Sequence, residues 1–199
     1  MILKKIFKFL LIITVTVTYA NALKKDEIQE QMTKKIDNVL LVLERKELSI
    51  SQKGDEIIKI IDEVFDYELM ARIALGKETW NSLSNEKQKE FVKVFENKLK
   101  KSYVEKLELY NDQKVKILGL KPYNNTRLQL ETELIGKEGN YKINYNFYNK
   151  AKDSEQWLIY DVDLLGVSII QTYRQQFSGL LKEKTFDEML VLLETSNKK

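Results

Sequence analysis

Apolar side chains recur every three or four residues through the first half of the chain, which is the spacing of amphipathic helices. The pattern predicts a helix over 28–43 and, after a polar break over 47–54, a second helix over 57–65. Ser84 is placed to cap a long helix over about 85–110. The first half of the chain is therefore predicted to be helical.

From residue 114 onward the apolar period changes to two, which is typical of half-buried strands. Four strands are predicted, over 115–117, 128–134, 141–147 and 157–164. The single proline, Pro122, is expected in a connector. Helices return after Gly166, and a last helix starts at Thr185 with a capping box to Glu188. The predicted class is α+β, with an antiparallel four- to five-stranded sheet wrapped by helices.

Aromatic residues fall on the predicted inward faces of these elements or close to them: Tyr103, Tyr110, Tyr141, Tyr145, Phe147, Tyr160, Tyr173 and Phe177. One interpretation is an ordinary core with tyrosine hydroxyls at its rim. The other is a concave sheet that the helices do not fill, which leaves an apolar pocket with polar groups at its mouth. The pattern alone does not separate a filled core from a hollow one.

The composition excludes several kinds of active site. The 199 residues include no His and no Cys, so Ser-His-Asp triads, thiolate chemistry, ordinary zinc sites and disulfides are ruled out. No glycine-rich phosphate loop occurs either. Asp161 and Asp163 form the one carboxylate pair that could serve a hydrolase or hold a divalent ion. The simpler interpretation of this pair is a solvated or salt-bridged strand face.

Residues 1–22 have the pattern of a secretory signal peptide, with three lysines, an apolar run and a small-x-small site that ends at Ala22. The alternative is an uncleaved anchor. Cleavage after Ala22 removes three of the 33 basic residues and leaves 30 against 30 acidic residues in 23–199. We therefore expect a neutral single domain over 23–199 without general attraction to nucleic acid. Export without cysteine suits the bacterial periplasm.

Two segments resemble the signature of the MlaC family, also called toluene-tolerance auxiliary proteins of ABC transporters. The first runs over 67–76 and continues with Trp80, Phe91 and Phe95. The second combines the stretches 157–162, 166–170 and 173–177. The similarity in pattern extends from about Asp26 to Leu193. Leu165 departs from it, since family members often have an acid before the glycine.

This resemblance implies an NTF2-like fold with an apolar cavity, and a periplasmic carrier that shuttles glycerophospholipid between outer-membrane and inner-membrane complexes. Such transport maintains the lipid asymmetry of the outer membrane. The implied partners are phospholipid, an inner-membrane ABC transporter complex with its substrate-binding subunit, and an outer-membrane lipoprotein–porin complex. We expect a monomer that binds no nucleic acid, with no catalytic residue, metal or cofactor, and with phospholipid as its cargo.

The residues expected to bind lipid are apolar or aromatic: Tyr103, Leu107, Leu128, Leu130, Tyr145, Phe147, Tyr160, Val167, Ile170, Tyr173 and Phe177. Arg72 and Arg174 lie in the signature segments and are candidates for contact with the headgroup or a partner. For both arginines, a structural ion pair is the alternative. Two other functions stay open, namely a periplasmic NTF2-like enzyme acting on a small apolar substrate, which the lack of His disfavours, and a protein-only adaptor.

Overall fold

The computed structural model describes residues 22–110, 112–151 and 155–196, so the predicted signal segment lies outside it except for Ala22. The helical elements in chain order are α1 (Ile28–Glu44), α2 (Ile50–Ile61), η1 (Asp62–Val64), α3 (Tyr67–Leu75), α4 (Lys77–Ser82), α5 (Asn85–Val104), η2 (Glu105–Leu109), α6 (Ile169–Leu180) and α7 (Phe186–Ser196).

The strands form one antiparallel sheet whose order follows the chain. They are β1 (Lys114–Asn124), β2 (Arg127–Gly136), β3 (Gly139–Asn149), β4 (Trp157–Leu164) and β5 (Val167–Ser168). Each strand pairs with the next one, as a meander requires. The predicted α+β class and the antiparallel sheet are confirmed.

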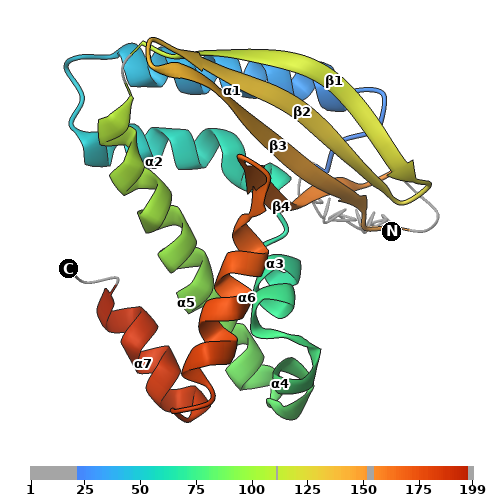
Figure 1. Ribbon diagram of the computed structural model, residues 1–199, viewed down its shortest axis with the longest axis vertical. Coiled ribbons are helices and arrows are strands. Elements are labelled where there is room, and N and C mark those ends of the chain that lie inside the picture. The colour runs from blue at the N-terminus through green and yellow to red at the C-terminus, as the bar shows by residue number, and fades with distance from the viewer. Residues whose placement is uncertain (1–21, 111, 152–154, 197–199) are drawn as a thin grey trace, which may run out of the picture.

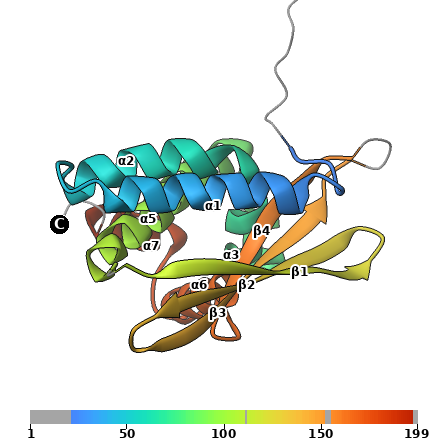
Figure 2. The ribbon, with the colours of Figure 1, turned by 90° about the horizontal axis from the view of Figure 1, so that it is seen from above.

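The helices occupy two places around the sheet. Helix α1 lies over one face of it with α2 at its side (Figure 2), whereas α3 to α7 gather beyond β4 (Figure 1). Each group has its own apolar cluster, one between the sheet and α1 and one among α3, α5, α6 and α7. Phe65 and Ile169 pack against both clusters and join them.

Helix α2 starts at Ile50, seven residues earlier than the sequence pattern predicts. The Ser49 hydroxyl accepts from the Gln52 N–H, and the Gln52 side chain accepts from the Ser49 N–H, which completes a capping box. Gly54, expected to break the chain, lies inside the helix and is buried. A Cβ atom there would come within 2.6 Å of Val104, so glycine lets α2 approach α5 closely.

A bulge in β4 changes which of its side chains face which way. Between β3 and β4 the register shifts after Asn146, so that Tyr160 becomes an extra residue on β4. Ile159 and Val162 consequently face the same side, and Tyr160 does not share it. Strand β1 extends through Pro122, which the sequence pattern left in a connector. An edge strand tolerates proline because one side of its backbone has no partner strand.

Candidate functional site

The sheet face covered by α1 is the apolar one, and we call it the inner face. It is formed by Leu128, Leu130, Thr132 and Leu134 of β2, Tyr141, Ile143, Tyr145 and Phe147 of β3, and Ile159, Val162 and Leu164 of β4. Cross-strand partners align these residues in rows across the sheet. The inner face is therefore a continuous apolar surface.

Burial along the inner face falls from one end to the other. Phe147 and Ile159 are fully buried, at 0% exposure, in the row that packs under the start of α1. Toward the β2–β3 turn, Leu134 and Ile143 are only half-buried, and Tyr141 is 39% exposed. Protein interiors are close-packed, so the half-buried rows lie outside such an interior. The sheet is thus sealed at one end and loosely covered at the other.

Helix α1 shows the same gradient along its apolar stripe. Ile28 and Met32, in its first turns, are buried in the cluster with the sheet. Ile36, Val39 and Leu43 continue that stripe at helical spacing but are only half-buried. Val42, near the end of the helix, is buried as well but belongs to neither cluster, so α1 packs into the sheet cluster only at its start.

Half-buried apolar side chains from several neighbouring elements belong to neither cluster, and we call them the loose apolar region. They are Ile36, Val39, Leu40 and Leu43 of α1, Ile58 and Ile61 of α2, Leu107 of η2, Val115 of β1 and Leu134 of β2. Their elements adjoin one another, since α1 contacts α2 and β1, and α2 contacts η2. Apolar groups that stay half-exposed on adjoining elements offer a surface that an apolar ligand can cover.

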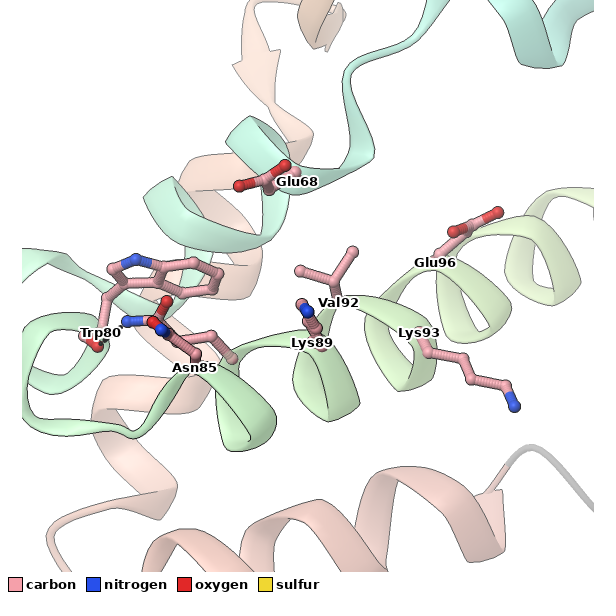
Figure 3. A pocket seen from close by; sticks show the side chains of 8 residues that line it. Glu68, Trp80, Asn85, Lys89, Val92, Lys93 and Glu96 are labelled. Atoms are coloured by element: carbon pink, nitrogen blue, oxygen red, sulfur yellow. Dashed lines mark hydrogen bonds between the residues drawn. The ribbon is translucent and has the colours of Figure 1, made fainter.

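A separate pocket of about 380 Å³ lies between α3, α4 and α5 (Figure 3). Its walls are Glu68, Trp80, Asn85, Gln88, Lys89, Val92, Lys93 and Glu96, and the Gln88 amide donates to the Trp80 carbonyl at 2.9 Å. Four of these eight residues are charged, and none belongs to the inner face. This pocket lacks the continuous apolar wall that a hydrocarbon chain would need.

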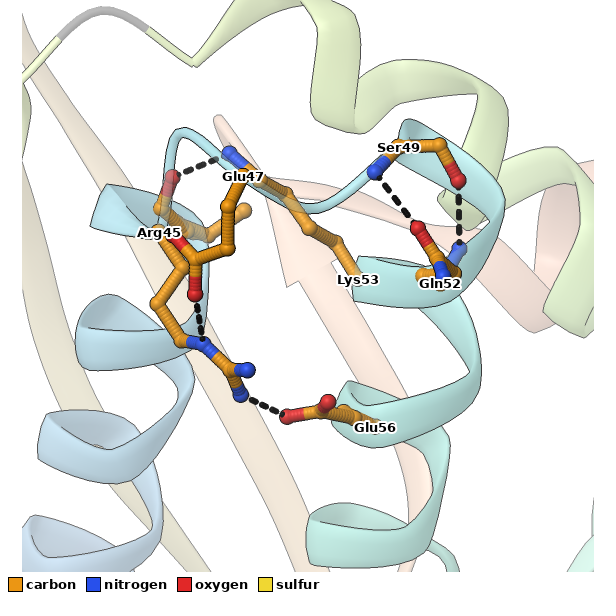
Figure 4. A network of polar contacts seen from close by, with 7 residues as sticks. Arg45, Glu47, Ser49, Gln52, Lys53 and Glu56 are labelled. Carbon is orange, nitrogen blue, oxygen red and sulfur yellow. Dashed lines mark hydrogen bonds and ion pairs between the residues drawn. The ribbon is translucent and has the colours of Figure 1, made fainter.

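The two helices over the loose apolar region are tied together by polar contacts (Figure 4). The Arg45 guanidinium donates to Glu47 at 2.8 Å and to Glu56 at 2.6 Å, which joins the end of α1 to α2. The Lys53 ammonium donates to the Leu43 carbonyl at 2.6 Å. The α1–α2 pair is consequently held as one unit by contacts that do not involve the sheet.

Tyr145 places a half-buried hydroxyl on the inner face, next to the fully buried Thr132. Burial alone raises the pKa of Tyr145 to about 12. Its hydroxyl has no hydrogen-bond partner within the described part of the chain, whereas the neighbouring Thr132 hydroxyl donates to the Ile143 carbonyl at 2.5 Å. The inner face is therefore almost free of polar groups that compete with an apolar ligand.

The carboxylate pair on β4 serves the fold. Asp161 is buried and accepts from the Ser168 hydroxyl at 2.6 Å and from the N–H groups of Val162 and Ile170 at 2.9 and 3.1 Å. Burial nevertheless raises the pKa of this carboxyl. Asp163 accepts from the Gln129 amide at 3.3 Å. The first carboxylate thus holds the start of α6, and the described residues contain no acidic cluster that could hold a metal ion.

The structure separates the predicted lipid-binding residues into groups. Leu128, Leu130, Tyr145 and Phe147 lie together on the inner face. Tyr103, Ile170, Tyr173 and Phe177 belong to the cluster of α3 to α7, where the Tyr173 hydroxyl approaches that of Ser102 at 3.5 Å. Leu107 belongs to the loose apolar region. The structure thus places these residues in different clusters, and their role in lipid binding stays a prediction.

The two remaining predicted residues, Val167 and Tyr160, lie on opposite faces of the sheet. Val167 pairs with Leu164, so it is at the loosely covered end of the inner face, where it is 60% exposed. Tyr160 stacks edge-on against Tyr148, which lies on the opposite face. Its predicted inward orientation is wrong because the β4 bulge shifts the alternation by one residue.

Sequence reasoning did not include α1 and α2 in the site. Their apolar stripes predict helices that pack on something, but periodicity does not reveal how tightly they pack.

Arg72 and Arg174 are exposed, and neither forms an ion pair within the described residues, contrary to the structural alternative considered for them. No helix among the described residues combines the length and apolar character needed to cross a membrane.

Known proteins match this chain over most of its length. The family model described as MlaC protein matches residues 33–195. The intermembrane phospholipid transport system binding protein MlaC of Haemophilus influenzae is 25% identical over 119 residues, which are 59% of this chain and 56% of that protein. The alignment thus spans little more than half of the relative's length.

A solved structure has the same fold. It is the phospholipid-binding protein from Ralstonia solanacearum in complex with a phospholipid, with 19% identity and a TM-score of 0.72. The alignment covers 85% of this chain and 96% of the solved one. The family model covers well over half of the chain, including the whole sheet, and it shows that this chain belongs to the MlaC protein family.

Proposed function

We propose that this protein is a non-enzymatic carrier that holds a glycerophospholipid by its acyl chains in the loose apolar region, against the inner face. The observation that carries the proposal is the fall in burial along one continuous apolar face, from Phe147 to Tyr141. The Ralstonia structure, which contains a phospholipid, and the name of the Haemophilus relative support it.

Burial of hydrocarbon supplies the physical reason for a carrier. Each buried methylene is worth ~0.8 kcal/mol, so two sixteen-carbon tails represent on the order of 25 kcal/mol of aqueous exposure. A free lipid therefore crosses water very slowly. A protein that shields the tails removes this barrier without catalysis, and any energy input has to come from a partner.

The exposed end of the inner face is the proposed entrance. Tyr141 and Val167, at 39% and 60% exposure, offer apolar surface at the edge of the sheet. Chains that enter between this edge and the α1–α2 pair extend toward the sealed end, and the headgroup stays near solvent. The phenol of Tyr141 suits such a boundary because its ring is apolar and its hydroxyl is polar.

We further propose that the carrier works in the periplasm, after removal of residues 1–22, and exchanges lipid with inner-membrane and outer-membrane complexes. The name of the Haemophilus relative, an intermembrane phospholipid transport system binding protein, supports this placement. An enzymatic role has little support, since His and Cys are absent and Asp161 is occupied at the start of α6.

The test is the lipid content of the purified protein, measured by organic extraction and mass spectrometry. Val39→Trp fills the loose apolar region from α1, whereas Leu41→Trp adds the same ring to a residue of α1 that is 60% exposed. We expect about one phospholipid per wild-type chain, a clear loss in Val39→Trp, and no change in Leu41→Trp. Wild-type protein without lipid, or equal lipid in both variants, would contradict the proposal.

A further inference from the structure

The sheet face opposite α1, which we call the outer face, carries a patch of tyrosines and cations. Its members are Lys121 and Tyr123 of β1, Arg127 of β2, Tyr148 of β3 and Tyr160 of β4. The Arg127 guanidinium lies 5.4 Å from the centroid of the Tyr160 ring, and the Lys121 ammonium lies 5.8 Å from that of Tyr123. The Tyr148 and Tyr160 rings meet edge to face at 5.9 Å. The contacts of Tyr160 join β2, β3 and β4, and the Lys121–Tyr123 contact of β1 completes the outer patch.

Arg72 of α3 borders the outer patch beside Tyr148. Its positive charge acts on the Tyr148 hydroxyl and opposes the rise in the pKa of that group, which burial and Asp66 cause. Together with Lys121 and Arg127, it gives the patch three exposed cations. Three of its members therefore favour contact with negative charge.

None of these three cations forms an ion pair within the part of the chain that the structure describes. Nearby carboxylates are engaged elsewhere. Asp66 accepts from the Tyr148 hydroxyl and pairs with Lys150 at 3.0 Å, and Asp163 accepts from the Gln129 amide at 3.3 Å. Glu68 is exposed on α3 but does not pair with Arg72. Lys121 and Arg127 thus lie over aromatic rings, and the N–H donors of all three cations stay available.

We propose that the outer patch is a docking surface for a protein partner that presents carboxylates. A guanidinium held over a ring loses little freedom when it binds a carboxylate with two parallel hydrogen bonds. Tyrosine and arginine are also the residues that most often dominate protein interfaces, and Tyr123 is 54% exposed. The patch accordingly combines a rigid aromatic platform with unpaired positive charge.

A bilayer is the less suitable occupant. Recognition of anionic lipid surfaces relies on clusters of about four to eight Lys or Arg. The outer patch has three cations separated by tyrosines, and residues 23–199 carry equal numbers of basic and acidic side chains. This arrangement favours a few directed contacts with carboxylates over non-specific electrostatic attraction to an anionic surface.

This inference rests on the proposed function, because a carrier has to dock on whatever supplies or receives its cargo. The outer patch and the inner face lie on opposite sides of the same sheet. A partner bound there would hold the carrier while leaving the exposed end of the inner face uncovered.

The experiment is site-specific photocrosslinking in the cells that make the protein, with benzoylphenylalanine in place of Tyr123. The control carries the same group at Val191, which is 56% exposed on α7. We expect a crosslinked protein at Tyr123 only, identified by mass spectrometry. Arg127→Glu should reduce its yield about tenfold, the effect of losing one charge-assisted contact. Lys182→Glu, an exposed change of equal charge, should leave the yield unchanged.

Reversing the charge of an acidic residue on the identified partner should restore the crosslink with Arg127→Glu. Equal crosslinking at Val191, or a yield indifferent to Arg127→Glu, would overturn the proposal. Cosedimentation with phosphatidylglycerol vesicles that depends on Arg127 would also overturn it, in favour of a bilayer. Lipid content measured on the same preparations separates the two proposals, since Arg127→Glu should retain lipid, and wild-type protein without lipid contradicts only the carrier function.

Discussion

Asp66 shows how one buried side chain holds several parts of the fold together. It caps α3 through the Leu69 N–H at 2.9 Å, accepts from the Tyr148 hydroxyl, and pairs with Lys150 of the loop after β3. Burial opposes its charge, but these three contacts outweigh burial and lower the pKa of Asp66 below its ordinary value of 3.8. Its contribution to stability is therefore present above about pH 4 and is lost as the pH falls through the lowered pKa.

Asp66→Asn should consequently lower the free energy of unfolding by roughly 1–3 kcal/mol at pH 7, since a buried charge network loses its centre. The difference from the wild type should shrink at pH 3. Asp37→Asn, at an exposed position of α1, should have almost no effect at either pH. Chemical denaturation at both pH values measures these changes, and a difference that does not depend on pH would be at odds with the role of the Asp66 charge.

Two glycines in helices predict opposite effects of the same change. A Cβ atom at Gly54 would meet Val104 at 2.6 Å, so Gly54→Ala should push α2 from α5 and reduce stability by about 1–3 kcal/mol. Gly179 has open space around it, so Gly179→Ala should stabilise α6 by up to about 1 kcal/mol. Thermal unfolding of both variants measures these changes. Equal shifts in melting temperature would mean that the close contact between α2 and α5 does not exclude a larger side chain at position 54.

At the scale of elements, helix ends were easier to predict than strand faces. The caps at Ser84 and at Thr185 are as predicted, because each depends only on residues within one turn. The capping box at Ser49 was missed because Gly54 suggested a break, although a glycine inside a helix is tolerated where another helix comes close.

Strand faces depend on register, which a local pattern does not contain. Leu128, Leu130, Tyr145 and Phe147 were correctly expected to share a face, since β2 and β3 pair without a bulge. Tyr160 was not, because it is itself the extra residue of the β4 bulge, where the alternation of faces is interrupted. The α1 and α2 walls of the site were missed for a different reason, as looseness of packing is a property of the assembled molecule.

Loss of the capping box gives a prediction for α2 as a whole. Ser49→Ala removes the hydroxyl that accepts from the Gln52 N–H, and it should lower the free energy of unfolding by about 1 kcal/mol. Ser51→Ala, inside the same helix and exposed, should have no cost or a slight gain. Chemical denaturation compares the two, and an equal loss in both would show that the cap does not support α2.

At the scale of the molecule, the two apolar clusters differ in how closely they are packed. The cluster of α3 to α7 is built from fully buried residues such as Phe91, Phe95 and Phe177, whose rings meet at 5.7–6.0 Å. The sheet and α1 are packed in this way only at one end. A rigid helical unit therefore anchors a sheet whose other half is loosely covered, which is the arrangement that the carrier function requires.

The central claim is that acyl chains lie against the inner face, and the two tryptophans of the chain allow a direct test. Trp157 belongs to the sheet cluster, whereas Trp80 lines the charged pocket of the helical unit. Phospholipids with brominated chain ends quench tryptophan fluorescence at short range. In the Trp80→Phe variant, such lipids should strongly quench the fluorescence of the remaining Trp157. In the Trp157→Phe variant, they should leave the fluorescence of the remaining Trp80 unaffected. Stronger quenching of Trp80 would place the chains elsewhere and contradict the account.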